Sequence, residues 1–316
     1  MVEGLIVATP NMLDPAGSEA HRLAGVWWLL LAMATAVAVL VLGLMVVGLF
    51  RRGDAADADG GEGSDQRDHR FIFAGGLVLP VVVLSIVAVV TVTTVTALRQ
   101  HKPNEVKVDV EGEQWFWRVR YPDSGVISAN LIRLPVDRPV AITLHSDDVI
   151  HSFWVPRLAG KLDVIPGQTN RLRFTPTEVG RFRGECAEFC GLQHANMAFE
   201  VRVMDGAAYD RWIARRQRGV LSLSSALARE GQRVFAQQSC AGCHAISGVS
   251  DGQRGPDLTD FGSRPAIGAG VVPNTKAHLA DWIRNAPGVK PGVNMPPSAL
   301  TDRQVKALVA YLEALP

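Results

Sequence analysis

The chain has 316 residues, of which 47% are hydrophobic and 20% charged, and its formal net charge is +1. This length suits about two globular domains. Because the charges nearly balance, the composition lacks the basic excess that accompanies nucleic-acid binding, and no nucleic acid is expected among the partners.

Two segments near the N-terminus are long and apolar enough to cross a membrane. Residues 23–50 and 71–98 contain no Asp, Glu, Lys or Arg. A helix of that length extends roughly 42 Å, more than a hydrocarbon core of about 30 Å. The sequence therefore predicts an outer segment over residues 1–22 and a transmembrane hairpin over residues 23–98. The basic residues of the connecting loop weakly favour a cytoplasmic loop with both termini outside: Arg51, Arg52, Arg67 and Arg70.

From residue 105 the hydrophobic period changes to two. Apolar and polar residues alternate in short segments separated by Gly, Pro and Asp turns, which is typical of half-buried strands. The apolar positions are Val106, Val108 and Val110, then Trp115, Trp117, Val119 and Tyr121, then Val140, Ile142 and Leu144, and later Phe199, Val201 and Val203. Residues 99–218 are therefore predicted to form a β-sandwich of about 100 residues, closed by a short helix over residues 207–216.

A short linker over residues 219–224 precedes a region of helical period. Helices are predicted over residues 226–238, 278–285 and 301–315, and Thr301 with Gln304 forms a capping box at the start of the last one. Residues 225–316 are thus predicted to be an all-α domain. The predicted fold class is a multidomain membrane protein with a two-helix transmembrane hairpin, an all-β domain and an all-α domain.

The motif Cys240-Ala-Gly-Cys243-His244 has the spacing of a covalent haem c site. Two thiols on one helical turn can add to the vinyl groups of a haem, and the next residue supplies the proximal imidazole. A thioredoxin-like redox pair would need a βαβ context, and a zinc site would need two further ligands nearby. Met295, the one methionine after this motif, is the candidate sixth ligand, and His278 is its rival.

A second group of soft donors lies in the β-rich region. Cys186, Cys190, His194 and Met197 fall within twelve residues, and such donors favour copper or zinc over magnesium or calcium. The second cysteine could bridge a second metal ion, and each ion would then need a nitrogen ligand. His151 is the candidate for the missing imidazole and His145 its rival. The alternatives are a disulfide between Cys186 and Cys190, a zinc site and a copper-chaperone pair.

Together these motifs resemble two known families. Residues 14–216 are similar to cytochrome c oxidase subunit II, through the stretches Gly112–Trp117, His151–Pro156, Lys161–Gly167 and Cys186–Met197, and residues 225–316 are similar to a class I cytochrome c. The first resemblance implies a Greek-key cupredoxin domain with a dinuclear copper A centre. It implies bridging thiolates from Cys186 and Cys190, terminal imidazoles from His151 and His194, the thioether of Met197 and the backbone carbonyl of Glu188. It also implies a magnesium ion shared with subunit I at the Glu188 side chain, and a part in electron transfer for Trp115.

The resemblance further implies a function. Electrons would pass from the haem of Cys240, Cys243, His244 and Met295 through copper A to subunit I, where dioxygen is reduced to water and protons are pumped. The implied partners are subunit I, subunit III, membrane lipid, and either quinol:cytochrome c reductase or a soluble cytochrome c as donor. The implied location is the bacterial plasma membrane, with the copper and haem domains on the outer side.

Two alternatives stay open from the sequence: the copper A subunit of a nitric oxide reductase, and a membrane-tethered electron carrier without a catalytic partner. The chain also departs from the family pattern. Many relatives carry a glutamate near the start of the second span, whereas residues 71–98 contain no carboxylate and the nearby groups are Asp68 and His69. A role of this subunit in proton uptake is therefore not implied.

Overall fold

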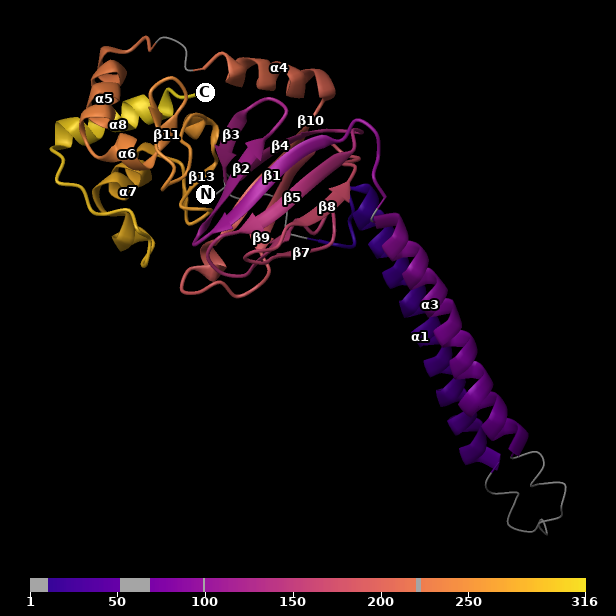
Figure 1. The fold of residues 1–316 in the computed structure, drawn as a ribbon. Helices are drawn as coiled ribbons and strands as arrows, with labels where there is room; N and C mark the ends of the chain where they lie inside the picture. Colours follow the sequence, from indigo (N-terminus) through magenta and orange to yellow (C-terminus); the bar gives the residue numbers. More distant parts are fainter. Residues whose placement is uncertain (1–10, 52–68, 99, 220–222) are drawn as a thin grey trace. The chain divides into compact units, whose positions relative to one another are not determined.

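The structure, a computed structural model, describes residues 11–51, 69–98, 100–219 and 223–316. It consists of two compact units: His21–Gln100 form one, and His101–Pro316 with the chain up to Ala20 form the other (Figure 1). Most of the predicted loop over residues 51–70, half of the predicted linker over residues 219–224 and the start of the outer segment over residues 1–22 lie outside the described residues.

The first unit consists of long apolar helices. Helix α1 (Ser18–Arg51) begins before the predicted residue 23. The second helical segment, His69–Leu98, contains a π-helical turn, η1 (Ala74–Val78), followed by α3 (Leu79–Leu98). The most apolar windows of the two segments have mean hydropathies of 2.8 and 2.7 and no buried residue. By length and composition, both segments can cross a membrane.

Within the second unit, residues 101–218 form a β-sandwich, named here the sandwich domain. One sheet has the order β3-β2-β1-β5-β8 and the other β4-β10-β9-β6-β7. The pairs β1–β5 and β4–β10 are parallel and the remaining pairs antiparallel. The strands are β1 (Val106–Glu113), β2 (Phe116–Tyr121), β3 (Val126–Ala129), β4 (Leu131–Pro135), β5 (Val140–Ser146), β6 (His151–Trp154), β7 (Leu162–Val164), β8 (Asn170–Phe174), β9 (Gly180–Cys186) and β10 (Ala198–Met204).

The core of the sandwich domain contains the predicted apolar positions and an aromatic cluster. The Trp117 and Phe153 ring centroids are 5.7 Å apart, and Phe153 stacks on Phe199 at 4.6 Å. A Cβ at Gly184 would lie 2.2 Å from Phe199 Cζ, so this position of β9 has room only for glycine. The same core includes Cys186, and it thus gives the end of β9 a rigid, water-free base.

Residues 225–316, named here the helical domain, are built around two packed helices. Helix α5 (Ala226–Gln237) packs against α8 (Asp302–Glu313), and a Cβ at Gly231 would lie 2.0 Å from Ala307 O. The predicted capping box of Thr301 and Gln304 is confirmed. The other elements are α6 (Cys240–Cys243), α7 (Lys276–Val289), η3 (Phe261–Ser263) and two short hairpins, β11 (Ala245–Ile246) with β12 (Ser250–Asp251) and β13 (Ala266–Ile267) with β14 (Val272–Pro273).

Several helices differ from their predicted bounds: α5 ends one residue earlier, at Gln237, and α8 covers Asp302–Glu313 rather than residues 301–315. The predicted helix over residues 278–285 starts earlier, at Lys276, after the N-cap Thr275, and continues to Val289 across a kink at Asn285. Pro287 lies two residues after the kink, where its ring disfavours a regular helix. The helix that closes the sandwich, α4, covers Gly206–Gln217 rather than residues 207–216.

The polar face of the sandwich strands departs from the half-buried pattern. Arg118, Ser128 and Arg133 are at most 6% exposed. The helical domain supplies their partners: Arg118 Nη2 donates to the Gln253 carbonyl at 2.7 Å, and Ser128 Oγ and Arg133 Nη1 reach Asp260 at 2.8 and 3.0 Å. These strands are therefore covered on both faces, and the two domains form a single unit.

Candidate metal centre and haem-attachment site

The candidate metal centre is built by one loop and one neighbouring strand. The loop between β9 and β10, residues 186–197, is named here the ligand loop. Its ends are fixed because β9 and β10 pair with each other, up to Glu185 opposite Ala198. Strand β6 pairs with β9 so that Phe153 lies opposite Cys186. This pairing brings His151, at the start of β6, to the loop.

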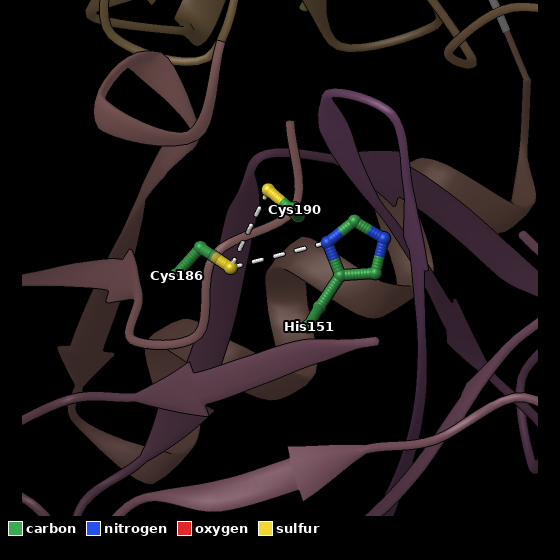
Figure 2. A group of neighbouring side chains, drawn as sticks. All are labelled: His151, Cys186 and Cys190. Atoms are coloured by element: carbon green, nitrogen blue, oxygen red, sulfur yellow. Dashed lines mark hydrogen bonds between the residues drawn. The ribbon is translucent and has the colours of Figure 1, made fainter. Parts of the chain in front are cut away.

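The two cysteines and His151 form a tight cluster (Figure 2). Cys186 Sγ lies 3.8 Å from Cys190 Sγ and 3.9 Å from His151 Nδ1. A disulfide needs a sulfur separation of about 2.05 Å, so the disulfide alternative does not describe this geometry and both cysteines are free thiols. His151, Cys186 and Cys190 offer ligand atoms that all lie within 4.8 Å of one another.

Three further donors named by the sequence surround this pair of sulfurs. His194 Nδ1 and Met197 Sδ each lie 3.7 Å from Cys190 Sγ, and the Glu188 carbonyl lies 3.2 Å from Cys186 Sγ. The rival imidazole lies elsewhere, since His145 Nε2 faces Glu111 Oε2 at 3.8 Å. The Glu188 side chain itself is exposed. The structure thus brings the six predicted copper donors together.

The two thiols are in hydrogen-bonding contact and affect each other's pKa. The hydrogen bond between their sulfurs lowers the pKa of Cys186 and raises the pKa of Cys190. His151 and the backbone around Glu188 and Ser152 also help to lower the pKa of Cys186. A metal ion would bind the two sulfurs as thiolates, so metal binding would be coupled to loss of protons.

Asp148, which the sequence analysis did not single out, orients the His151 ring. Its Oδ1 lies 2.9 Å from His151 Nε2, while Oδ2 accepts from the Gln114 amide at 2.6 Å. Burial lowers the pKa of His151, but the hydrogen bonds with Asp148 and Cys186 outweigh it and raise this pKa overall. Because the carboxylate occupies Nε2, Nδ1 is left to face the sulfurs. A carboxylate bonded to the second ring nitrogen is the usual support for a metal-binding histidine. The signal in the sequence was an acidic residue three positions before a candidate ligand.

Trp115 lies beside the ligand loop. Its indole Nε1 donates to the Cys190 carbonyl at 2.9 Å, and Gln114 Nε2 donates to the same oxygen at 2.8 Å. Gly191 has a φ of +107°, and a Cβ there would lie 3.0 Å from Gln114 Nε2. The glycine therefore permits both the left-handed turn and the close approach of these two side chains.

The donor set fits a pair of soft metal ions. Cys186, Cys190 and Met197 are at most 7% exposed, so their sulfurs are shielded from water. Thiolate, thioether and imidazole donors prefer copper or zinc to magnesium or calcium. A single tetrahedral zinc ion would use two cysteines and two histidines. The buried thioether of Met197 is the feature that such a zinc site would leave without a role.

The candidate haem residues lie in the helical domain on two separate segments. Helix α6 carries Cys240 and Cys243, and His244 follows as its C-cap. His244 Nδ1 lies 2.9 Å from the Pro256 carbonyl, and burial lowers the pKa of His244. A neutral ring that donates from Nδ1 keeps Nε2 free as an iron ligand. A Cβ at Gly255 would lie 2.6 Å from His244 Cε1, so this position also requires glycine.

Met295 lies on the loop after α7 and is half-buried. The end of this loop is held by Ser298, whose amide and hydroxyl donate to the carbonyls of Arg284 and Ile283 at 3.0 and 2.8 Å. The rival ligand, His278, is half-buried rather than exposed, with Nδ1 3.0 Å from the Pro273 carbonyl. This contact occupies one ring nitrogen of His278.

The fold and the two sites define a class of protein: a membrane-anchored cupredoxin with a fused c-type cytochrome domain. A family model described as cytochrome c oxidase subunit II, periplasmic domain, matches residues 126–204, and a cytochrome c model matches residues 228–316. The chain belongs to the cytochrome c oxidase subunit II family. It is therefore similar to subunits of an oxidoreductase, the haem-copper terminal oxidase.

Two named relatives support this membership. Cytochrome c oxidase subunit 2 of Alkalihalophilus pseudofirmus is 36% identical over 245 residues, which cover 75% of this chain and 71% of that protein. The Bacillus subtilis subunit 2 is 30% identical over 78% of this chain and 75% of its own length. The solved periplasmic domain of subunit II of the Bradyrhizobium japonicum cytochrome oxidase is 28% identical, with a TM-score of 0.36, and covers 37% of this chain and 96% of that chain.

Proposed function

We propose that this chain is the subunit through which electrons enter a haem-copper terminal oxidase. It would pass electrons from a covalent haem c through dinuclear copper A to subunit I, for reduction of dioxygen to water with proton pumping. The observation that carries the proposal is the convergence of four further donors on two sulfurs 3.8 Å apart. Family membership of most of the chain supports the same proposal.

When bound, the copper pair would supply a one-electron couple whose charge is spread over both ions. Cys186, Cys190, His151, His194, Met197 and the Glu188 carbonyl would hold the ions. Asp148 holds the His151 ring with Nδ1 toward the sulfurs. The protein's contribution is thus a fixed, dry ligand set rather than acid–base groups.

The helical domain would hold the second electron carrier. Cys240 and Cys243 would hold a haem through their thiols, and His244 and Met295 would hold its iron. The Pro256 carbonyl fixes the His244 ring through Nδ1. A thioether ligand raises the reduction potential relative to an imidazole. Trp115 would be the aromatic residue on the electron route, because its indole is hydrogen-bonded to the backbone of Cys190.

The remaining assignments concern partners and location. Helices α1 and α3 would span the bacterial plasma membrane beside subunit I and subunit III, with the other domains on the outer side, where haem c is attached. The exposed Glu188 carboxylate would contribute to a magnesium site shared with subunit I. Quinol:cytochrome c reductase or a soluble cytochrome c would supply the electrons.

Metal analysis and optical spectroscopy on the purified complex test this proposal. We expect a pair of copper ions with a near-infrared band and a single c-type haem per chain. Stoichiometric zinc without that band would overturn the copper assignment. Oxygen consumption is the expected activity, whereas nitric oxide consumption alone would identify a nitric oxide reductase. A chain that purifies without a many-span haem subunit would be a tethered carrier.

A further inference from the structure

A lysine is buried where the helical domain meets the ligand loop. Lys290 directly follows α7 and is 1% exposed. Its Nζ donates to the carbonyls of Trp115, Asn196 and Gly268 at 2.9, 2.8 and 2.8 Å. The first two carbonyls belong to the sandwich domain and the third to the helical domain. An ammonium group has three N–H donors, so all of them are used.

Burial of this ammonium group carries a cost that its partners have to offset. Desolvation lowers the pKa of Lys290 to about 7, whereas hydrogen bonds to carbonyl oxygens favour the charged form. Among the residues that the structure describes, no carboxylate forms an ion pair with Lys290. A buried ammonium without such a counter-ion is unfavourable unless it is fully hydrogen-bonded. The lysine is therefore held in place by three backbone segments that have to stay together.

The residues next to Lys290 contact the ligand loop and Trp115. The Pro291 carbonyl accepts from Gln193 Nε2 at 2.8 Å. A Cβ at Gly292, where φ is +89°, would lie 3.3 Å from Trp115 Cη2. Trp115 in turn donates to the Cys190 carbonyl. The segment between Lys290 and Met295 therefore contacts Trp115, which is hydrogen-bonded to the backbone of the candidate copper ligand Cys190.

We propose that Lys290 is a positioning residue for electron transfer: its ammonium group locks the Met295 segment onto Trp115 and the ligand loop. The inference rests on the electron-transfer function proposed above. Without this lock, the Met295 segment would have to redock on Trp115 before each transfer, so the observed rate would scale with the docked fraction. The lock keeps the donor at a fixed distance from the acceptor.

The test replaces Lys290 with methionine in the assembled complex, with Lys306→Met as the matched control. Methionine keeps the apolar stem and removes all three N–H donors, while Lys306 is exposed on α8. We expect the haem-to-copper electron-transfer rate after flash reduction to fall at least about tenfold in the Lys290 variant and to stay unchanged in the control, since charged hydrogen bonds set the docked population.

Further readouts separate positioning from folding. Haem content, haem reduction potential and reduction of the haem by a small external donor should all stay at wild-type values. Hydrogen exchange on copper-free protein should accelerate at the Ala198 amide, which is bonded to the Ala269 carbonyl across the two domains at 2.9 Å. If the methionine variant fails to bind haem, Lys290→Gln, which keeps two N–H donors, serves for the same measurements.

Each outcome has a distinct meaning. A wild-type transfer rate and wild-type exchange in the Lys290 variants would overturn the positioning role. A slower transfer with a shifted haem potential would overturn it as well, because the lysine would then act on the haem site. If the wild-type protein carries both cofactors but transfers no electron between them, the proposed function fails instead.

Discussion

The two candidate cofactor sites are constructed in opposite ways. The copper donors touch one another: Cys190 Sγ alone lies within 3.8 Å of Cys186 Sγ, His194 Nδ1 and Met197 Sδ. The haem residues have separate partners, with His244 bonded to Pro256 and Met295 on another loop. A small ion needs donors in mutual contact, whereas a porphyrin lies between its axial ligands and needs them apart. The fold itself therefore brings the candidate copper donors together.

The largest expected effect comes from the shared sulfurs. Cys186→Ser should lower copper affinity by more than about a hundredfold, because even residues that only support metal ligands change affinity about 10- to 100-fold. Haem content should not change, since the haem residues share no contact with the sulfurs. Metal analysis with haem spectroscopy measures both. Glu185→Gln, one residue away in an exposed ion pair, is the control. Retention of a copper pair in the serine variant would contradict the bridging role.

The contact between the domains should show the next largest effect. Asp260 is fully buried and binds Arg133 at 3.0 Å, with Arg264 as a second partner. Asp260→Asn leaves buried guanidinium groups without their counter-charge, so the free energy of unfolding should fall by about 3–5 kcal/mol. Urea unfolding followed by tryptophan fluorescence measures the loss. Asp251→Asn, on an exposed hairpin position, is the control.

The same carboxylate gives a pH dependence with a definite sign. Burial raises the pKa of Asp260, but the charges of Arg264, Arg216 and Arg133 outweigh this and hold it well below its ordinary value of 3.8. The stabilisation is therefore complete above that ordinary value and is lost as the pH falls below it. The asparagine variant should lack this acid-sensitive component. An unchanged acid transition in that variant would exclude Asp260 as its source.

A smaller effect is expected from the residue that orients His151. Asp148→Asn removes the charged partner of Nε2, so copper affinity should fall about 10- to 100-fold while the ligands stay in place. Competition with a copper chelator measures the change. Asp147→Asn, at the exposed neighbouring position, should leave affinity unaltered. Equal affinities in all three proteins would show that the fold alone orients the ring.

The smallest effect should be confined to the helical domain. Thr301→Ala removes the hydroxyl that accepts from the Gln304 amide, and the loss of an N-cap costs about 1 kcal/mol. Thermal unfolding followed at the haem band measures it, and copper content should not change. Thr301→Ser keeps the hydroxyl and should behave as wild type. A loss of copper in the alanine variant would show that the two sites are coupled more strongly than their separate constructions imply.

The candidate copper and haem residues could be proposed from the sequence because most of them lie close together in it. Cys186 to Met197 form one loop and Cys240 to His244 form one turn, so their spacing indicated a soft-metal site and a haem site, whereas the family resemblance implied the individual copper ligands. His151 was harder to find, because it joins the ligand loop only through the pairing of β6 with β9. The capping box at Thr301 is also a local pattern, and the structure confirms it.

The residues that the sequence did not reveal depend on contacts between distant segments. Lys290 bonds to carbonyls of Trp115 and Asn196, which no local pattern links to it. The polar residues of β2 predicted an ordinary half-buried strand, because alternation cannot show that another domain will cover it. Asp148 resembled any acidic turn residue until the position of His151 was known. Hydrogen bonds from a side chain to backbone carbonyls cannot be predicted from the pattern of side chains in the sequence.

The close packing of α5 on α8 at Gly231 sets an order of maturation for the protein. These helices are the first and last of the helical domain, so its core closes only after the ribosome has delivered α8. Both β-sheets and the ligand loop precede α5 in the chain and can fold while synthesis continues. The ligand loop can therefore fold before the core of the helical domain closes.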